Sequence, residues 1–509
     1  MFATACFLFA VSLPLTQAQL ESEQDLRPNI ILFLVDDLGW QDTSVPMAKE
    51  AVPQNRHFRT PQLQRLAQTG VRFEQAYAAA VCSPTRTSLM TGQNPARHRV
   101  TNWTLKADRD QSGKTARLQS PDWRNQGLQP GEPTLPALLQ QAGYFTIHAG
   151  KAHWGADQTP GEDPCNLGFD RNIAGHCAGA PGHYAGQHDF GFGKDIWGVP
   201  GLADYHGLPI HLSDALTVEA CKAVREAVDR EQPFYLYMAH YAVHAPIRAH
   251  PPYDQAYLEA GVDAVESRYA SMVEGVDASL GALLACVERL GVGERTLVMF
   301  ASDNGGLSVH ARGKARTGSG DHSHNWPLRE GKGSAYEGGT RIPQVISWAV
   351  PAADHPLQRR LPVEAGAIRQ TPTIVEDYFP TLLAWAGVPL PENHPLDGMD
   401  FTPLLQRDDL GEDRPLLFHY PHVWGPKGPG YQPHSAMRLG PWKVIYFYQP
   451  QRWELYRLDR DLGEKKDLAK KQAEVLRRMA RRMVSELEAR KAQYPRLRQG
   501  GTEEAPVLP

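Results

Sequence analysis

The sequence predicts an α/β protein with a large, mostly parallel sheet flanked by helices, followed by a smaller C-terminal α+β domain. The first observation is that short apolar runs, rich in β-branched and aromatic residues, alternate with helical patterns between residues 29 and 387. Such alternation is typical of a parallel sheet covered by helices. The second observation is a change after residue 410, where several short strand-like runs precede one long amphipathic helix. Consecutive short strands indicate an antiparallel sheet.

The elements of the large domain follow from local patterns. Its expected strands are continuous apolar runs, and its expected helices show apolar residues at helical spacing, several of them ending at glycine. The strands are NIILFLV (29–35), YFTIHA (144–149), FYLYMA (234–239), TLVMFAS (296–302) and PQVISW (343–348). The helices cover residues 60–70, 134–143, 216–228, 267–291 and 373–387.

The small domain is expected to combine an antiparallel sheet with one helix. The strand-like runs are RPLLFHY (414–420), SAMRLG (435–440), WKVIYFY (442–448) and WELYRL (453–458), and the helix covers about residues 464–490. Arg477, Arg478, Arg481 and Arg482 lie on that helix. A nucleic-acid patch is one interpretation of these arginines, but we favour a solvated helix face. The expected domains are therefore 27–410 and 411–498, followed by a disordered tail at 499–509.

The N-terminus predicts export. Residues 1–18 form an uncharged apolar stretch that ends in small residues, and the first charged residue is Glu21. This pattern is typical of a secretory signal peptide, and the stretch is too short to span a bilayer comfortably. We expect a periplasmic or extracellular protein without a membrane span; an N-terminal anchor is the alternative. The chain carries 53 basic and 57 acidic residues, a net charge of −4, which gives no general attraction to nucleic acid.

The cysteine count singles out one residue. Of the six cysteines, Cys6 would leave with the signal peptide, and an odd number would remain. In an oxidising compartment at least one of them is therefore unpaired or modified. Cys165 and Cys177 lie in one glycine-rich loop and could pair, whereas Cys221 and Cys286 lie in helical patterns and are expected to be buried thiols. Cys82 is left without an evident partner.

Polar residues, most of them ionisable, follow four of the expected strands. Asp36 and Asp37 follow the first strand, Lys151 and His153 the second, His240 and His244 the third, and Asp303 and Asn304 the fourth. Ligands of open α/β sheets bind at the carboxyl ends of the strands. We therefore expect these side chains to share one site.

The oxygen ligands in this set predict a metal. Three carboxylates brought close together repel one another unless a cation lies between them. Oxygen donors favour Ca²⁺, with Mg²⁺ as the alternative, over zinc. The competing interpretation is that Asp36–Asp37 and Asp303–Asn304 serve as turn and helix-cap residues.

Cys82 is expected near a helix N-terminus, because Pro84 suits the first turn of a helix. A thiolate there would be stabilised by the helix dipole and by Arg86, which is the arrangement of a cysteine hydrolase. A thiolate beside three carboxylates is electrostatically unfavourable, however, and a buried structural cysteine is the simpler alternative.

These residues resemble a known family. CSPTR (82–86) matches the Cys-x-Pro-x-Arg signature of the type I sulfatases, in the alkaline phosphatase superfamily, whose cysteine is oxidised to Cα-formylglycine. Further blocks resemble that family in the same order along nearly all of the mature chain. They are RPNIILFLVDDLGW (27–40), GYFTIHAGKAHWG (143–155), AVHAPI (242–247), SDNGG (302–306), REGKGSAYEGGTRIP (329–343), LDGMDFTPLL (396–405) and WELYRLDRDLGEKKDLA (453–469).

The resemblance implies an exported sulfatase in which a hydroxyl of the hydrated formylglycine attacks sulfur. Its second hydroxyl then allows the covalent sulfate to be expelled, with His153 as the base. The implied Ca²⁺ ligands are Asp36, Asp37, Asp303, Asn304 and the modified Cys82. The implied catalytic residues are Cys82, Arg86, Lys151, His153, His244 and Lys332. Arg86 would hold the formylglycine, and Lys151 and Lys332 would offset charge on the sulfuryl oxygens. Either His244 or Lys332 would protonate the leaving oxygen.

The chain departs from the family pattern at two positions. Ala152 stands where an aromatic residue is usual between the lysine and the histidine, and Gln93 stands where an arginine is usual. The first change is expected to alter the pocket wall. His240 is an alternative to His244, because both histidines follow the same strand.

The expected substrate is a sulfated carbohydrate, by analogy with exported sulfatases. Three unusual loops supply candidate substrate contacts, His176, His322 and Trp424, since aromatic and cationic groups suit sulfated sugars. Ordinary exposed loops are the simpler interpretation. The other expected partner is a formylglycine-generating maturation enzyme. A phosphate mono- or diester hydrolase of the same superfamily and a non-catalytic sugar-binding protein remain the alternative functions.

Overall fold

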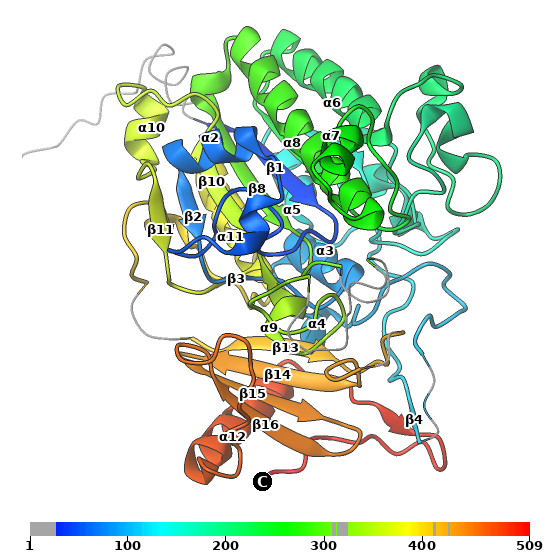
Figure 1. Cartoon of the computed structure of the whole chain (residues 1–509), viewed down its shortest axis with the longest axis vertical. Coiled ribbons are helices and arrows are strands. Elements are labelled where there is room, and N and C mark those ends of the chain that lie inside the picture. The colour runs from blue at the N-terminus through cyan, green and yellow to red at the C-terminus, as the bar shows by residue number, and fades with distance from the viewer. Residues whose placement is uncertain are drawn as a thin grey trace, which may run out of the picture.

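The computed structural model describes residues 27–509, except 114, 116, 308–311, 313–323, 411–413 and 426–427. The expected signal peptide (1–18) and His322 lie outside the described residues. The chain forms a large α/β body and a smaller sheet-and-helix domain beneath it in the view of Figure 1.

The large sheet has eight strands in the order β11-β2-β10-β8-β1-β7-β5-β6. The five strands from β8 to β6 run parallel, which confirms the predicted fold class. At the other side, β10 runs antiparallel to both β8 and β2. The bounds are β1 Asn29–Val35, β2 Val71–Phe73, β5 Phe145–Gly150, β6 Arg171–Ile173, β7 Phe234–Ala239, β8 Thr296–Ser302, β10 Gln344–Trp348 and β11 Ala367–Arg369.

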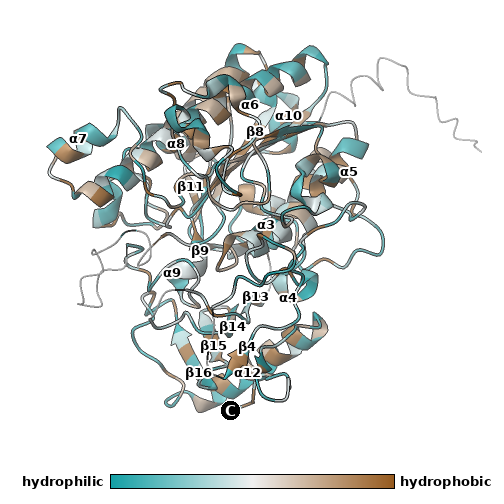
Figure 2. Ribbon diagram, turned by 90° about the vertical axis from the view of Figure 1, so that its right-hand side faces the viewer, coloured by the Kyte–Doolittle hydropathy of each residue, from teal (hydrophilic) through white to brown (hydrophobic). Residues whose placement is uncertain are grey.

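Both faces of this sheet are buried. Alternate residues of β1 enter two different apolar clusters, Ile30, Leu32 and Leu34 on one face and Ile31, Phe33 and Val35 on the other. This explains why the strands are continuous apolar runs, since successive side chains point to opposite faces. In Figure 2 hydrophobic colouring gathers along the central strands, and hydrophilic colouring lies on the outer loops.

Helices cover the two faces. One cluster holds side chains of α2 (Pro61–Thr69), α6 (Leu212–Asp229) and α8 (Ala264–Arg289). The other holds side chains of α3 (Cys82–Thr91), α5 (Leu135–Gln141) and α11 (Tyr378–Ala386). The remaining helices of the large body are short: α4 Pro95–His98, α7 Asp254–Glu259, α9 Glu337–Thr340 and α10 Pro356–Arg360.

Among the described residues, α8 is the one helix long and apolar enough to cross a membrane. Its most apolar window is 72% buried inside the molecule, as in the core helix of a globular protein. Length and composition alone are thus weak grounds for a membrane span.

The small domain has the expected antiparallel sheet in the order β13-β14-β15-β16, with α12 (Ala473–Ala489) against it. Its strands are β13 Leu416–Tyr420, β14 His434–Leu439, β15 Trp442–Phe447 and β16 Arg452–Arg457. The helix begins at Ala473 rather than near residue 464. The Asp461 and Asp467 side chains accept hydrogen bonds from the backbone N–H groups of Lys465, Lys466 and Ala469, and these bonds favour turns over helix.

The sequence patterns did not predict several short strands. The expected helix at 373–387 begins as β12 (Thr373–Ile374), which joins β3 (Ala76–Tyr77) and β9 (Arg341–Ile342) in a small sheet. A further pair joins β4 (Leu118–Gln119) to β17 (Arg496–Leu497). Within the expected tail, the Val507 carbonyl accepts a hydrogen bond from Trp453 Nε1 at 2.7 Å.

All five described cysteines are free in the structure, so Cys165 and Cys177 do not pair here. Cys165 is exposed, and Cys177 is buried in a small apolar cluster beside Leu105 and Ala178.

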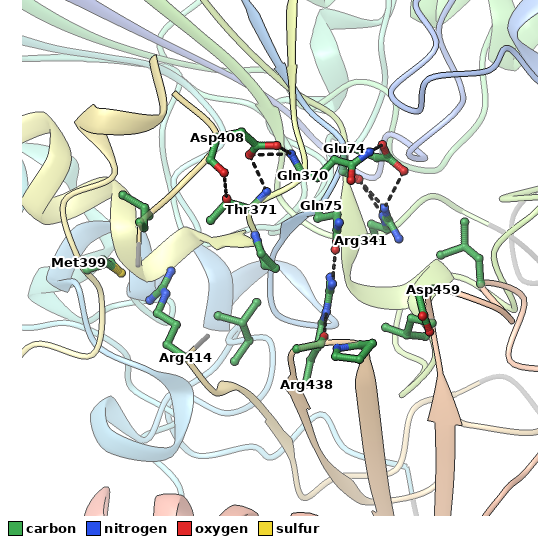
Figure 3. Close-up of a pocket in the computed structure, with 17 residues that line it drawn as sticks. Glu74, Gln75, Arg341, Gln370, Thr371, Met399, Asp408, Arg414, Arg438 and Asp459 are labelled. Carbon is green, nitrogen blue, oxygen red and sulfur yellow. Dashed lines mark hydrogen bonds and ion pairs between the residues drawn. The ribbon is translucent and has the colours of Figure 1, made fainter. Parts of the chain in front are cut away.

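A polar cavity of ≈ 750 Å³ lies between the two sheets (Figure 3). Its arginines have partners within the protein: Arg341 contacts Glu74, Arg438 contacts Gln75, and Arg414 contacts Asp377. Because these guanidinium groups already have hydrogen-bond or ion-pair partners, we assign the cavity no ligand.

Candidate active site

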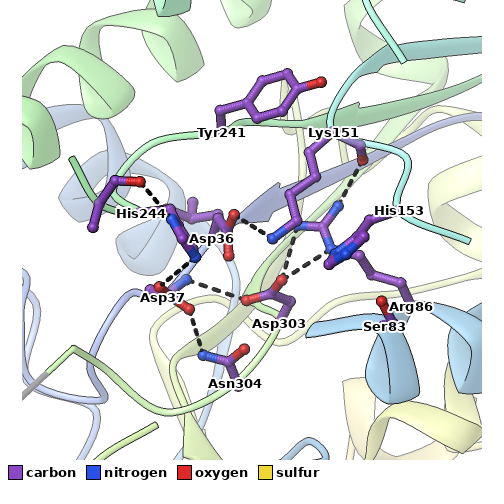
Figure 4. A network of polar contacts seen from close by, with 12 residues as sticks. Asp36, Asp37, Ser83, Arg86, Lys151, His153, Tyr241, His244, Asp303 and Asn304 are labelled. Atoms are coloured by element: carbon purple, nitrogen blue, oxygen red, sulfur yellow. Dashed lines mark hydrogen bonds and ion pairs between the residues drawn. The ribbon is translucent and has the colours of Figure 1, made fainter. Parts of the chain in front are cut away.

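The polar residues that follow β1, β5, β7 and β8 meet at the carboxyl end of the sheet (Figure 4). Strand order explains the meeting, because β5, β7, β1 and β8 are consecutive neighbours and parallel. Asp37 has a left-handed backbone (φ 63°), which breaks the strand's alternation, so Asp36 and Asp37 can serve one site.

Each carboxylate of this cluster has a cationic partner. Lys151 Nζ lies 2.6 Å from Asp36 Oδ2, and Lys332 Nζ lies 2.6 Å from Asp37 Oδ1. The third pair joins Arg86 Nε to Asp303 Oδ2 at 2.9 Å. All six side chains are at most 1% exposed, so these are buried ion pairs that bring three charges of each sign together.

Several oxygen atoms in the cluster have no hydrogen-bond partner among the described residues. They are Asp36 Oδ1, Asp37 Oδ2 and Asn304 Oδ1, and all are buried. Asn304 Nδ2 donates to Asp37 Oδ1 at 2.8 Å, which turns its own oxygen away from that carboxylate. Buried acceptors normally have partners. An unpartnered set of carboxylate and amide oxygens fits a hard cation such as Ca²⁺.

The pKa values of Asp36 and Asp37 are shifted in opposite directions. Burial and the neighbouring Asp303 raise the pKa of Asp36 well above its usual value, although Lys151 opposes them. Burial also acts to raise the pKa of Asp37, but Lys332 and His244 outweigh it and hold that pKa below its usual value. Coulomb attraction to the neighbouring Lys332 is therefore part of what keeps Asp37 charged.

Cys82 is the first residue of α3 and is 3% exposed. The helix ends at Gly92, whose left-handed backbone (φ 66°) and N–H bond to Ser88 O form a C-cap. Burial raises the pKa of the Cys82 thiol, although Lys151 and Lys332 act against it. The structure thus gives no support to the activated thiolate of a cysteine hydrolase.

Arg86, on this helix, and His153 are each held by a hydrogen bond to a backbone carbonyl. Arg86 Nη1 donates to the Lys151 carbonyl at 2.7 Å. His153 Nε2 lies 2.8 Å from the Thr104 carbonyl, so Nε2 carries the proton and donates. His153 Nδ1 is buried without a hydrogen-bond partner among the described residues, and it is therefore available as a proton acceptor.

His244, not His240, belongs to the cluster. His244 Nε2 lies 3.6 Å from Asp37 Oδ2, and its side chain is 21% exposed. His240 is fully buried, and its Nε2 lies 2.9 Å from Ser279 Oγ of α8, away from this network. Since His244 is much more exposed than its ionic neighbours, it marks the side from which solvent reaches the site.

Of the expected substrate contacts, Trp424 lies beside the cluster. Lys332 Nζ lies 5.8 Å from the centroid of the Trp424 ring, and Gly333 lies so close that an added Cβ would meet that ring. The small domain thus contributes to the wall of the site. His176 is 9% exposed, and its backbone carbonyl accepts a hydrogen bond from the backbone N–H of His153 at 3.2 Å.

Two supporting residues had no sequence signal. Tyr184 OH donates to the carbonyls of Tyr241 and His244, at 2.7 and 2.8 Å, and holds the loop that carries His244. Thr104, through its carbonyl, fixes the His153 ring. Both act across long sequence separations, which local patterns do not reveal.

Comparisons with known proteins identify the family of the chain. The sulfatase family model matches residues 28–388, and the model for the C-terminal part of N-sulphoglucosamine sulphohydrolase matches residues 350–493. The chain therefore belongs to the sulfatase family, and it is a sulfuric ester hydrolase.

Its relatives include enzymes of animals and bacteria. The human N-acetylgalactosamine-6-sulfatase is 30% identical over 442 residues, covering 84% of this chain and 73% of the relative. A sulfatase of Formosa agariphila is 28% identical over 519 residues, covering 91% and 88%. The crystal structure of Ps i-CgsB in complex with k-i-k-neocarrahexaose superposes with a TM-score of 0.69 at 28% identity, covering 91% and 93%.

Proposed function

We propose that this chain is an exported, Ca²⁺-dependent sulfatase of sulfated carbohydrates whose nucleophile is Cα-formylglycine made from Cys82. The observation that carries the proposal is the position of Cys82. It is buried at the start of α3, and the charges that act on it are those of Lys151, Lys332, Asp36 and Asp303. A cysteine in this place needs no disulfide partner if it is converted. Mg²⁺ is the alternative metal.

Asp36, Asp37, Asp303 and Asn304 would hold the cation, together with the side chain made from Cys82. The buried, unpartnered oxygens of Asp36, Asp37 and Asn304 support this assignment. When bound, the cation would act as a Lewis acid towards the nucleophile and the sulfuryl oxygens.

The positions of Lys151, Lys332 and Arg86 suit them to different roles in the reaction. Lys151 and Lys332 place two buried ammonium groups at the cluster, which suits the negative sulfuryl oxygens. Arg86, anchored to Asp303 and to the Lys151 carbonyl, would orient the residue derived from Cys82.

The histidines are suited to opposite ends of the reaction. His244 lies on the solvent side, where the alcohol must leave, so we assign it, with Lys332 as the alternative, to protonation of the leaving oxygen. His153 has a buried acceptor nitrogen and is assigned as the base that allows release of sulfate.

A sulfated carbohydrate is supported by the relatives and by Trp424. The similar proteins include the human N-acetylgalactosamine-6-sulfatase and Ps i-CgsB, whose structure was solved in complex with k-i-k-neocarrahexaose. An aromatic ring next to Lys332 offers a stacking surface beside an anion-binding cation.

The first test is the mass of the tryptic peptide that carries residue 82, from protein expressed with and without a formylglycine-generating enzyme. We expect the aldehyde or its hydrate in the first sample only. Sulfated galactose and N-acetylgalactosamine saccharides, 4-nitrophenyl sulfate and 4-nitrophenyl phosphate then form the activity panel, with Cys82→Ala as the control.

Turnover of a sulfated saccharide by the converted protein supports the proposal. A thiol at residue 82 in both samples, with unchanged turnover in Cys82→Ala, would overturn the assigned nucleophile. Faster turnover of the aryl phosphate than of every sulfate would instead favour the phosphoester hydrolase.

A further inference from the structure

Two cysteines outside the active site face each other across a pair of packed helices. Cys221 lies on α6 and Cys286 on α8, and the two helices lie side by side in Figure 1. Cys286 Sγ is 3.9 Å from the carbonyl oxygen of Cys221, although the two residues are 65 positions apart. Thr217 and Ser279, one and two turns earlier, also meet, with their hydroxyl oxygens 2.5 Å apart. The same faces of both helices are therefore in contact along several turns.

The cysteine pair is accessible from solvent. A cavity of ≈ 350 Å³ opens beside it and is lined by both cysteines together with Lys222, Arg225 and Arg289. Cys221 is half-buried, and Cys286 is 6% exposed. A small or proteinaceous oxidant can thus approach these thiols, unlike the enclosed Cys82.

The chemistry of the two thiols is asymmetric. A hydrogen bond from Cys221 and the positive charges of Arg289 and Arg225 lower the pKa of the Cys286 thiol, whereas the same bond raises the pKa of Cys221. Thiolates, not thiols, attack disulfides. Arg225 and Arg289 line the cavity together with the two thiols, and their positive charge favours a thiolate at Cys286, which we therefore assign as the attacking group.

We propose that Cys221 and Cys286 form a disulfide that joins α6 to α8 in the exported protein. The oxidant is a disulfide, carried by a thiol oxidoreductase or by glutathione. The Cys286 thiolate attacks one sulfur of that disulfide, a mixed disulfide forms, and the other sulfur leaves as a thiolate. Cys221 then loses its proton and attacks Cys286 Sγ, which expels the second oxidant thiol. Two protein thiols are oxidised, and one oxidant disulfide is reduced to two thiols.

The bond would stabilise the part of the chain that carries β7 and His244. The loop that it closes contains both of them, and α6 packs on β5 and β7. A disulfide acts mainly by restricting the unfolded chain. It would therefore raise the melting temperature without changing the contacts around Cys82.

The test is a peptide map of the full-length protein after incubation with glutathione disulfide, alkylation with N-ethylmaleimide and non-reducing digestion. We expect one linked peptide pair that carries Cys221 and Cys286. The single variant Cys221→Ser should leave Cys286 as a mixed disulfide with glutathione, which shows that the oxidant reaches it. Recovery of both residues as maleimide adducts in the wild type, with Cys286 glutathionylated in Cys221→Ser, would overturn the proposal.

Thermal unfolding gives an independent measurement. The oxidised wild type should melt several degrees higher than the same sample treated with a phosphine reductant. The matched control is the double variant Cys221→Ser/Cys286→Ser, whose melting temperature should not respond to the reductant. An equal response of both proteins would contradict a stabilising bond between these helices. Sulfatase activity should be the same in all samples, so the result does not depend on the proposed substrate.

Discussion

At the scale of single residues, the site is built from balanced buried charges. Asp36, Asp37 and Asp303 are neutralised by Lys151, Lys332 and Arg86. A bound divalent cation would therefore leave an excess of positive charge. A sulfate ester carries one negative charge, so this excess suits substrate binding.

Asn304 tests the metal assignment with little change in local charge. Asn304→Ala removes one of the unpartnered oxygens and should weaken Ca²⁺ binding at least about tenfold. Isothermal titration calorimetry of the chelator-treated protein measures the affinity directly. Asn172→Ala, which removes an amide that bonds to Gly175 and Asp163 far along the chain from these ligands, is the matched control. Equal affinities for the two variants would count against Asn304 as a ligand.

The buried carboxyl group of Glu376 should make the stability of the protein depend on pH. It is fully buried, Asn94 Nδ2 donates to its Oε1 at 2.6 Å, and burial, with Asp377, raises its pKa from 4.5 to about 8. The folded state therefore holds this proton more tightly than the unfolded state. The resulting stabilisation is complete below pH 4.5 and is lost as the pH rises through about 8.

Glu376→Gln cannot ionise and should escape this loss. The free energy of unfolding of the variant, relative to wild type, should rise between about pH 5 and about pH 8.5. Urea unfolding at several pH values measures it, and Glu474→Gln on the exposed face of α12 is the control. A difference that stays constant with pH would show that Glu376 is ionised in both states.

At the scale of elements, helix α2 is capped by another helix. Its N-cap residue Thr60 makes no side-chain capping bond. Instead Asp277 of α8 accepts hydrogen bonds from the backbone N–H groups of Gln62 and Leu63, at 2.9 and 2.8 Å. A tertiary contact thus satisfies donors that a local cap normally satisfies.

Asp277→Ala should destabilise the protein more than loss of an ordinary cap. It leaves two N–H groups without an acceptor, one of them buried, and we expect a loss of about 2–3 kcal/mol. Asp263→Ala, which removes the exposed local cap of α8, should cost about 1 kcal/mol. Urea denaturation of both variants measures the difference. A smaller loss for Asp277→Ala than for Asp263→Ala would contradict this tertiary cap.

At the scale of the whole molecule, the two sheets share one core. Phe418, Ala436 and Ile445 of the small domain belong to the apolar cluster that also contains Ile30 and Leu32 of β1. A buried ion cluster crosses the same seam, where Lys443 Nζ contacts Glu337 and Glu464 at 2.9 and 3.0 Å. We therefore expect one cooperative unfolding transition for both domains.

Lys443→Met tests this seam. The change removes the cation that Glu337 and Glu464 share, although Glu337 keeps its contact with Arg341, and it should cost about 3–5 kcal/mol. Lys470→Met, at an exposed position, should change stability little. Differential scanning calorimetry should show one transition, shifted to lower temperature in Lys443→Met. Two separate transitions in the wild type would show that the domains unfold independently.

The sequence predicted the large sheet well because its strands carry a local signal. Continuous apolar runs of strand length marked β1, β5, β7 and β8. The two- and three-residue strands β2, β3, β11 and β12 have no such signal, since partners distant in sequence define them. The start of α12 was misplaced because aspartate side chains bind the preceding backbone in turns.

The amino-acid sequence by itself determined the strands, the charged residues at their ends, and the cysteine motif that resembles the sulfatases. Only the tertiary structure decided which atoms are left without partners, that His244 rather than His240 joins the cluster, and that Trp424 of the small domain lies beside Lys332. The physical reason is the sequence separation between the interacting residues. Periodicity and the residues at strand ends involve only a few neighbouring positions. Hydrogen-bond pairing, burial and domain contacts depend on segments that meet only in the folded chain.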